Sequence, residues 1–275
     1  MLSPTHRMHS LLASAVFVLS FSLSPQANAA LVSYTSDGAD LVYSSISDVS
    51  WTKDAHLLSS MISNSGYSTV VDAILTANAG VTFGSTPYTL SNADFSNVGE
   101  TSWWGAMAFV HYLNTINYAG SDAWRLPTVT DIGNDGCNWS LGGTDCGYNA
   151  ATNGTAAGDE MAELYYKELN GQAYSGEHSQ YHGINSPLFS NVQSFYWTGT
   201  ELITDPNNAF IFFATYGDQS TYMKNSTVWY AWAVSPGSVI PVDVPTAVPE
   251  PETNALLLAG LGLILMFAVL RKRTT

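Results

Sequence analysis

The chain has 275 residues and a formal net charge of −14 at pH 7, from eight lysines and arginines against 22 aspartates and glutamates. Residues 30–248, which lie between two terminal segments of targeting type, hold four of the cations and 20 of the acids, a net charge of −16. A surface of this charge repels polyanions, so nucleic acid and anionic lipid are excluded as partners. The stretch is long enough for one domain with a hydrophobic core.

The N-terminal segment, residues 1–29, has the pattern of a secretory signal peptide. Arg7 precedes an apolar stretch over residues 11–23, and Ala27-Asn28-Ala29 follows as a small-residue cleavage site. We therefore expect the mature chain to begin at Ala30. A retained N-terminal anchor is the alternative, but the apolar stretch is only 13 residues long and is interrupted by serines.

The first half of the mature chain predicts a strand followed by helices. Residues 37–51 alternate in hydrophobicity and end on Trp51, which indicates a strand and a turn. Residues 59–79 carry apolar side chains close to helical spacing and indicate a helix less clearly. Residues 102–116 give the clearest helix, with Thr101 or Ser102 as its cap and an apolar stripe along it.

A Trp-Arg-Leu-Pro-Thr element occupies residues 124–128. We expect Pro127 to end a strand and Thr128 to cap a short helix that follows. Arg125 is the single arginine of residues 30–248, and two interpretations of it are open. Its guanidinium either clamps an acidic ligand or is buried against a carboxylate or against carbonyls at a strand end, and we favour the second.

A long loop rich in Gly, Asn and Asp follows over residues 131–158. Cys137 and Cys146 are the two cysteines of the chain, and in an exported protein we expect them to form a disulfide that fixes this loop. A metal-binding cysteine pair is the alternative, but the spacing fits no zinc pattern. Four oxygen-bearing side chains make the loop a weak Ca²⁺ candidate, and a polar loop held by the disulfide is the simpler interpretation. These four are Asp131, Asn134, Asp135 and Asp145.

Later segments predict one more helix and a terminal antiparallel sheet. Residues 161–169 form the helix, after an acidic start that suits the helix dipole. His178 and His182, four residues apart, could hold a metal on a helix, but their Gly- and Ser-rich surroundings favour loop histidines. Three strands are expected, at residues 194–201, 209–217 and 227–237. Helices first and a terminal antiparallel sheet afterwards predict a single α+β domain with long loops.

The eight tryptophans raise the question of stacking on sugars. Most of them lie at helix or strand spacing and are expected in the core. One or two exposed rings could stack on sugar faces, and the sequence does not show which ones.

The last 27 residues, 249–275, carry a second targeting pattern. Pro249-Glu250-Pro251 precedes an apolar run over residues 255–270, and the basic cluster Arg271-Lys272-Arg273 follows. As a helix the run spans roughly 24 Å, and flanking residues can make up the difference from a bilayer core of about 30 Å. The cluster places the C-terminus in the cytoplasm. A proline-rich linker, residues 238–248, precedes this segment.

This tail resembles the PEP-CTERM sorting signal of Gram-negative bacteria. The resemblance implies an inner-membrane helix, processing by an exosortase near Pro249-Glu250-Pro251, and delivery of the domain to the cell envelope, the cell surface or the extracellular matrix. In that family the signal accompanies exopolysaccharide and biofilm systems. A plain C-terminal membrane anchor is the alternative, and it leaves the Pro-Glu-Pro motif unexplained.

Residues 30–237 resemble the C-terminal domain of the Legionella collagen-like adhesin, a relative of C-type-lectin-like and formylglycine-generating-enzyme-like folds. Four segments carry the resemblance, at residues 47–55, 123–132, 195–201 and 229–237, and the element at 124–128 is the most specific. The adhesin domain is associated with sulfated glycosaminoglycans and with cell–cell adhesion. Four cations among 20 acids depart from that pattern, so a neutral glycan or a protein partner fits this chain better.

Motifs for catalysis are missing from the sequence: it has no G-x-S-x-G elbow, no phosphate-binding glycine loop and no H-E-x-x-H. We therefore expect a non-catalytic surface or matrix protein without a cofactor, which binds exopolysaccharide or another glycan in a biofilm. A Ca²⁺-dependent lectin-like adhesin for a protein or cell partner is one alternative. A matrix-acting glycan hydrolase is another, and it needs two carboxylates about 5–10 Å apart in a cleft.

Overall fold

The computed structural model describes residues 31–133, 137, 145–147, 159–172, 183–184 and 186–241. All of these lie in one compact unit, Ala29–Pro245, and the remainder of the chain, Met1–Asn28 and Thr246–Thr275, is assigned to a separate unit. The predicted signal peptide, residues 242–248 of the predicted linker and the predicted membrane span at 255–270 lie outside the described residues. Within the described ranges, no helix has the length and apolar character that crossing a bilayer requires.

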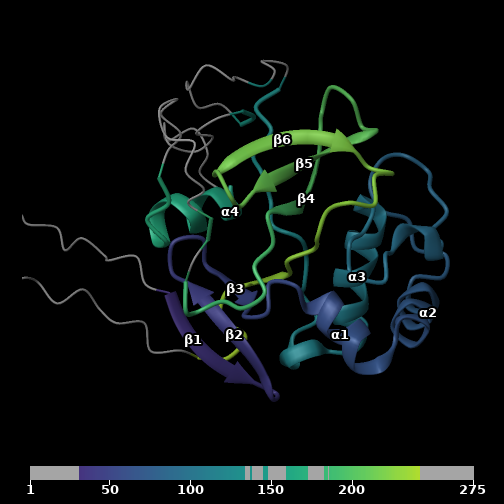
Figure 1. Cartoon of the computed structure of the whole chain (residues 1–275), viewed down its shortest axis with the longest axis horizontal. Coiled ribbons are helices and arrows are strands. Elements are labelled where there is room, and N and C mark those ends of the chain that lie inside the picture. Colours follow the sequence, from purple (N-terminus) through teal and green to yellow (C-terminus); the bar gives the residue numbers. More distant parts are fainter. Residues whose placement is uncertain are drawn as a thin grey trace, which may run out of the picture. The chain divides into compact units, whose positions relative to one another are not determined.

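The described residues form a mixed α+β domain with four α-helices and two antiparallel sheets, which confirms the predicted α+β class (Figure 1). The first sheet has the strand order β1-β2-β3-β7. Its strands are β1 (Leu31–Ser36), β2 (Ala39–Ser44), β3 (Val49–Thr52) and β7 (Val234–Pro236). The strand and turn predicted at 37–51 belong to this sheet. This segment contains the turn between β1 and β2, the strand β2, and most of β3, so it takes part in two hairpins rather than forming one strand.

The first hairpin turns at Asp37 and Gly38, which have φ values of 49° and 76°. Two successive positive φ values are typical of a type I′ turn, and Asp-Gly is one of the pairs that tolerate them. This turn sets the register of β1 against β2, with Ser36 opposite Ala39.

The second sheet has the order β4-β5-β6. It consists of β4 (Phe195–Glu201), β5 (Asn208–Phe213) and β6 (Asp218–Met223). The predicted strands at 194–201 and 209–217 correspond to β4 and β5. The third strand of this sheet was predicted at 227–237, and that prediction was wrong. The third strand is β6, which pairs with β5. Of residues 227–237 only Val234–Pro236 forms a strand, and it pairs with β3 in the first sheet.

Two groups of helices complete the domain. The helices α1 (Leu57–Ser65), α2 (Tyr67–Ala77) and α3 (Trp103–Thr115) lie together on one side in Figure 1. Ser102 caps α3, because its Oγ accepts a hydrogen bond from the Gly105 N–H at 3.0 Å. The short helix α4 (Glu160–Glu163) continues as a π-helical turn over Leu164–Glu168, which agrees with the helix predicted at 161–169.

The helix predicted after Pro127 was wrong: residues 126–133 are irregular. The reason lies in the hydrogen bonds of the backbone. The N–H groups of Thr128, Thr130 and Ile132 donate to carboxylates of Glu160, Asp159 and Asp145 at 2.8, 2.6 and 2.7 Å. Side-chain acceptors thus bind alternate N–H groups and hold the segment extended, where a helix would use the carbonyls of its own preceding turn.

The central strand β5 of the second sheet is buried on both faces, which explains its nearly continuous apolar run. On one face Trp197 and Ile211 pack with the helices α1–α3. On the other face Tyr196 and Phe212 pack with Trp232 and with residues of α4. The edge-to-face pair of Trp51 and Trp232, with ring centroids 4.9 Å apart, joins the first sheet to this second cluster.

Candidate functional site

Arg125 of the Trp-Arg-Leu-Pro-Thr element is held by an internal carboxylate. Its Nη1 and Nη2 donate to the two carboxylate oxygens of Glu160 at 2.7 and 2.6 Å, a bidentate pair. The Glu160 side chain is only 7% exposed, and the same carboxylate also accepts the Thr128 N–H. The neighbouring Trp124 and Leu126 are buried. The geometry therefore agrees with the structural interpretation of Arg125 rather than with a clamp for an external ligand.

The weak Ca²⁺ candidates are only partly described. Asn134 and Asp135 lie outside the described residues. Asp131 accepts the N–H groups of Gly133 and Ile203 at 2.8 and 2.6 Å, and Asp145 accepts that of Ile132. These carboxylates fix the backbone of the loop. Across the part of the chain that the structure describes, no three His, Cys, Asp or Glu side chains come together as a metal site.

The two cysteines form the expected disulfide between Cys137 and Cys146. Cys146 follows Asp145 directly and lies beside the contact in which Gly147 and Gln219 exchange backbone hydrogen bonds. His178 and His182, the other metal candidates, lie outside the described residues.

Every cation of residues 30–248 is described, and each is in an ion pair with an acidic side chain. The pairs are Lys53–Asp40, Arg125–Glu160, Lys167–Glu163 and Lys224–Glu201. Lys224 is fully buried, with its ammonium 4.3 Å from the ring centroid of Trp103. No cation is therefore left to build a basic groove for an acidic polymer.

Three carboxyl groups near α4 have raised pKa values because burial disfavours their charged forms. The pKa of Asp159 is raised to about 6, since its desolvation outweighs the hydrogen bonds from Thr130 and Gln219. Burial also raises the pKa of Asp218 to about 6 and that of Glu168 to about 7. None of these three is in an ion pair within the described ranges. We therefore expect the stability of this region to depend on pH.

The structure answers which tryptophans are in the core. Trp139 lies outside the described residues, and of the seven others only Trp229 is partly exposed. The six buried ones are Trp51, Trp103, Trp104, Trp124, Trp197 and Trp232. Trp229 is thus the one described tryptophan that a ligand can reach.

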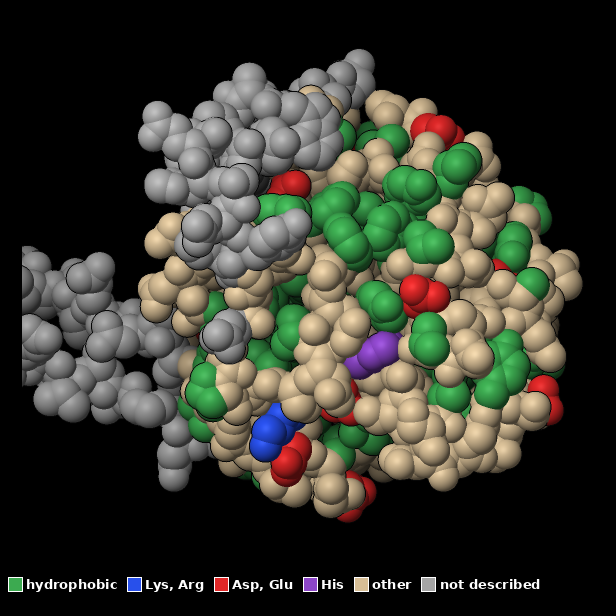
Figure 2. Space-filling model, in the orientation of Figure 1, with side chains coloured by type: hydrophobic (Ala, Val, Ile, Leu, Met, Phe, Trp, Pro, Cys, Tyr) green, Lys and Arg blue, Asp and Glu red, His purple; other side chains and the backbone are tan. Residues whose placement is uncertain are grey.

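Trp229 belongs to a group of rings that we call the aromatic face: Phe195, Phe213, Tyr222 and Trp229. The centroid of Trp229 lies 4.8 Å from Phe195, 5.2 Å from Tyr222 and 6.5 Å from Phe213. Phe195 and Phe213 are opposite each other in β4 and β5, so strand register brings them together. Figure 2 shows hydrophobic side chains gathered over the β4–β6 sheet, with the lysine and arginine side chains of this view well away from them. An exposed apolar patch of this kind is typical of a binding surface.

Sequence reasoning missed Tyr222. Its strand reads Asp-Gln-Ser-Thr-Tyr-Met, which has none of the alternation that marked β4 and β5. Only the pairing of β6 with β5 places Tyr222 beside Ala209, on the face that Trp229 covers.

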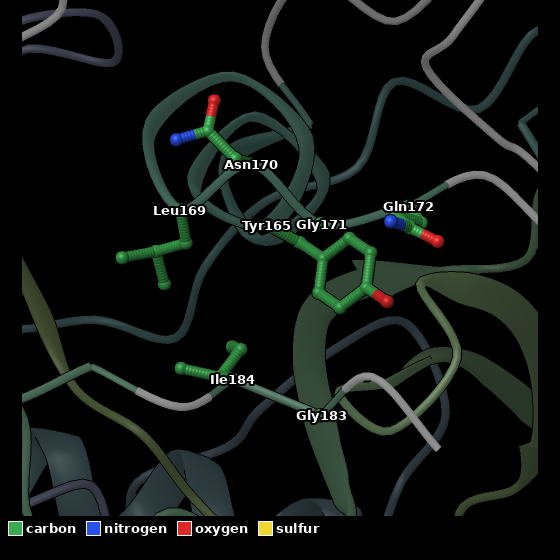
Figure 3. Close-up of a pocket in the computed structure, with 7 residues that line it drawn as sticks. All are labelled: Tyr165, Leu169, Asn170, Gly171, Gln172, Gly183 and Ile184. Carbon is green, nitrogen blue, oxygen red and sulfur yellow. The ribbon is translucent and has the colours of Figure 1, made fainter. Parts of the chain in front are cut away.

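A small pocket of about 180 Å³ lies beside the π-helical turn (Figure 3). Tyr165, Leu169 and Ile184 are among the described residues that line it, and none of those described residues is acidic or basic. It is smaller than the 300–1,000 Å³ typical of small-molecule sites. The aromatic face is therefore the stronger candidate site.

The Arg125–Glu160 pair can be tested by Glu160→Gln. The amide cannot accept both guanidinium N–H groups and leaves a mostly buried charge unpaired, so we expect a loss of about 2–3 kcal/mol in the free energy of unfolding. Urea denaturation followed by circular dichroism measures it. Lys53→Met, which breaks the exposed pair with Asp40, is the matched control and is expected to change stability much less. Equal losses in the two variants would contradict the assignment.

Stability is expected to fall as pH rises from 5 to 7.5. Asp159, Asp218 and Glu168 have higher pKa values in the folded protein than in the unfolded chain, so their protonation favours the fold and its contribution is lost as pH rises through about 6–7. Half-buried His56, whose pKa is lowered by desolvation, has the opposite effect on stability, but it is one group and the raised carboxyl groups are three. Urea midpoints at the two pH values measure the effect. Asp159→Asn should reduce the difference, and a higher midpoint at pH 7.5 would contradict the prediction.

Comparison with known proteins identifies one segment. Residues 247–273 match the family model of the PEP-CTERM protein-sorting motif. The match includes all six predicted sorting residues, Pro249, Glu250, Pro251, Arg271, Lys272 and Arg273. No curated protein and no solved structure matches the chain, so the resemblance of residues 30–237 to the adhesin domain remains a prediction. The motif implies that the protein is exported, processed by an exosortase and sorted to the cell surface.

Proposed function

We propose that this chain is a non-catalytic protein of the cell surface or extracellular matrix, whose lectin-like domain binds exopolysaccharide or another glycan. The sorting motif at residues 247–273 is the observation that carries the proposal, because it directs the domain to the compartment where such polymers lie. The oxidised cysteine pair is consistent with that compartment.

The electrostatics of the domain support a glycan without strong negative charge. The domain carries a net charge of −16, and all four of its cations are paired internally. A sulfated polymer would meet repulsion without compensating contacts. The aromatic face offers apolar contact area instead.

A catalytic role has less support. The buried carboxylates of Asp145, Asp159 and Glu160 bind backbone N–H groups, and Glu163 is paired with Lys167. Groups engaged in this way are poorly placed to act as the acid and nucleophile of a glycosidase. None of the described residues that line the pocket in Figure 3 carries a carboxylate.

The sorting step can be tested by replacing Pro249, Glu250 and Pro251 with alanine. Processing near the motif should stop, so the chain should keep its C-terminal tail and remain in the membrane fraction. Immunoblots of cell fractions, with the tag placed after Ala30, measure the size and location. Pro245→Ala lies outside the matched residues and is the matched control, which should behave as the parent. Release of the triple variant at the parent's size would contradict exosortase processing.

Glycan binding can be tested by co-sedimentation of residues 29–245, the compact unit with its own cores, with exopolysaccharide from the producing strain. We expect the protein to sediment with the polymer both in buffer and in EDTA. Loss of binding in EDTA would favour the Ca²⁺-dependent adhesin, through Asp131 and its loop. New reducing ends would favour the hydrolase, and failure to sediment in both buffers would contradict the proposed function.

A further inference from the structure

We infer that Tyr222 and Trp229 form a stacking site for a neutral polysaccharide. This inference rests on the proposed function and adds to it the binding surface and the class of polymer. It follows from the ring geometry, from the atoms that the rings expose and from the charges around them.

Backbone contacts fix the position of Trp229. Its carbonyl accepts the Thr101 N–H at 2.8 Å, and the next residue, Tyr230, pairs with β4 by accepting the Trp197 N–H at 2.9 Å and donating to the Phe195 carbonyl at 3.3 Å. Phe195 and Phe213 then support the indole from the sheet. A ring held in this way loses little conformational entropy when a ligand stacks on it.

Tyr222 is the more accessible ring of the two. Its side chain is on the edge strand β6, and the residue is 40% exposed. The rings of Tyr222 and Trp229 meet edge to face, at 87°. Among the ring contacts of the described residues, Tyr222 has only this one, so its ring keeps open surface for a ligand.

Trp229 exposes carbon atoms of its ring and no hydrogen-bond donor of its side chain. Its indole nitrogen is buried and has no hydrogen-bond partner in the described part of the chain. The accessible part of the ring is therefore apolar, and it suits the C–H face of a pyranose ring rather than a carboxylate or a sulfate.

Charge near the aromatic face selects against acidic sugars. Lys224 follows Tyr222 by two residues, but it is fully buried and paired with Glu201, so its charge is neutralised below the surface. Glu100 accepts a long hydrogen bond, 3.4 Å, from the hydroxyl of Tyr230, next to Trp229. A uronate or sulfate would meet the domain's net charge of −16 without an unpaired lysine or arginine to offset it.

The test uses exopolysaccharide of the producing strain, separated by anion exchange into neutral and acidic fractions. Affinity electrophoresis of residues 29–245 in each fraction gives the dissociation constants. We expect binding to the neutral fraction, and Tyr222→Ala should weaken it by about tenfold, because the variant loses the apolar ring on which a sugar stacks. Tyr43→Ala, which removes an aromatic ring from β2 in the other sheet, is the matched control and should bind as the parent. Trp229→Tyr keeps a ring and should bind better than Trp229→Ala.

The outcomes separate this inference from the proposed function. If the parent binds the neutral fraction and Tyr222→Ala binds it equally well, the site assignment is overturned and the proposed function stands. Preference for the acidic fraction overturns the ligand class. Failure of the parent to bind either fraction overturns both. Light scattering of the parent and of Tyr222→Ala tests whether a second copy of the chain occupies the aromatic face instead. A dimer that the substitution dissociates would make the aromatic face a self-association surface and overturn the inference.

Discussion

The segment Trp229–Pro236 connects the parts of the domain, and most of the structure depends on its hydrogen bonds. Tyr230 pairs with β4 of the second sheet, Ala233 accepts the Thr52 N–H of the first, and Val234 exchanges two bonds of 2.9 Å with Arg125. The indole of Trp232 donates to the Thr52 carbonyl at 2.8 Å. Since Trp232 also packs against rings of both sheets, one short segment unites their cores.

This connection determines which aromatic side chains remain for binding. From Ala231 to Ser235 every residue is buried, so these side chains are used inside the domain. Trp229 lies at the start of the segment, before it passes between the sheets, and stays partly exposed. The element at 124–128 is used internally in the same way, because Arg125 binds Val234 through its backbone and Glu160 through its side chain. A surface site in this domain is therefore restricted to its periphery.

Local patterns in the sequence predicted the elements that depend on local physics. The helix α3 follows from its apolar stripe and the Ser102 cap, and β4 and β5 follow from apolar runs bounded by turn residues. The predictions were wrong where contacts with residues distant in the sequence determine the local structure. Alternation around Trp232 predicted a third strand of the terminal sheet, but the segment lies buried and only Val234–Pro236 forms a strand, paired with β3. Thr128 looked like a helix cap, but its N–H binds Glu160, 32 residues away. Tyr222 could not be placed, because only strand pairing brings it to Trp229.

The distribution of charge along the chain fits this division between an internal framework and an exported surface. Four of the eight cations lie at the two ends of the chain, one in the predicted signal peptide and three in the segment that matches the sorting motif. Each of the other four forms an ion pair with an acidic side chain of the same domain, which offsets its charge toward distant solutes. The exported surface is acidic and polar, with an apolar patch over the β4–β6 sheet. An acidic surface attracts only cations by long-range electrostatics. The binding of a neutral partner to it therefore depends on shape and on buried apolar area.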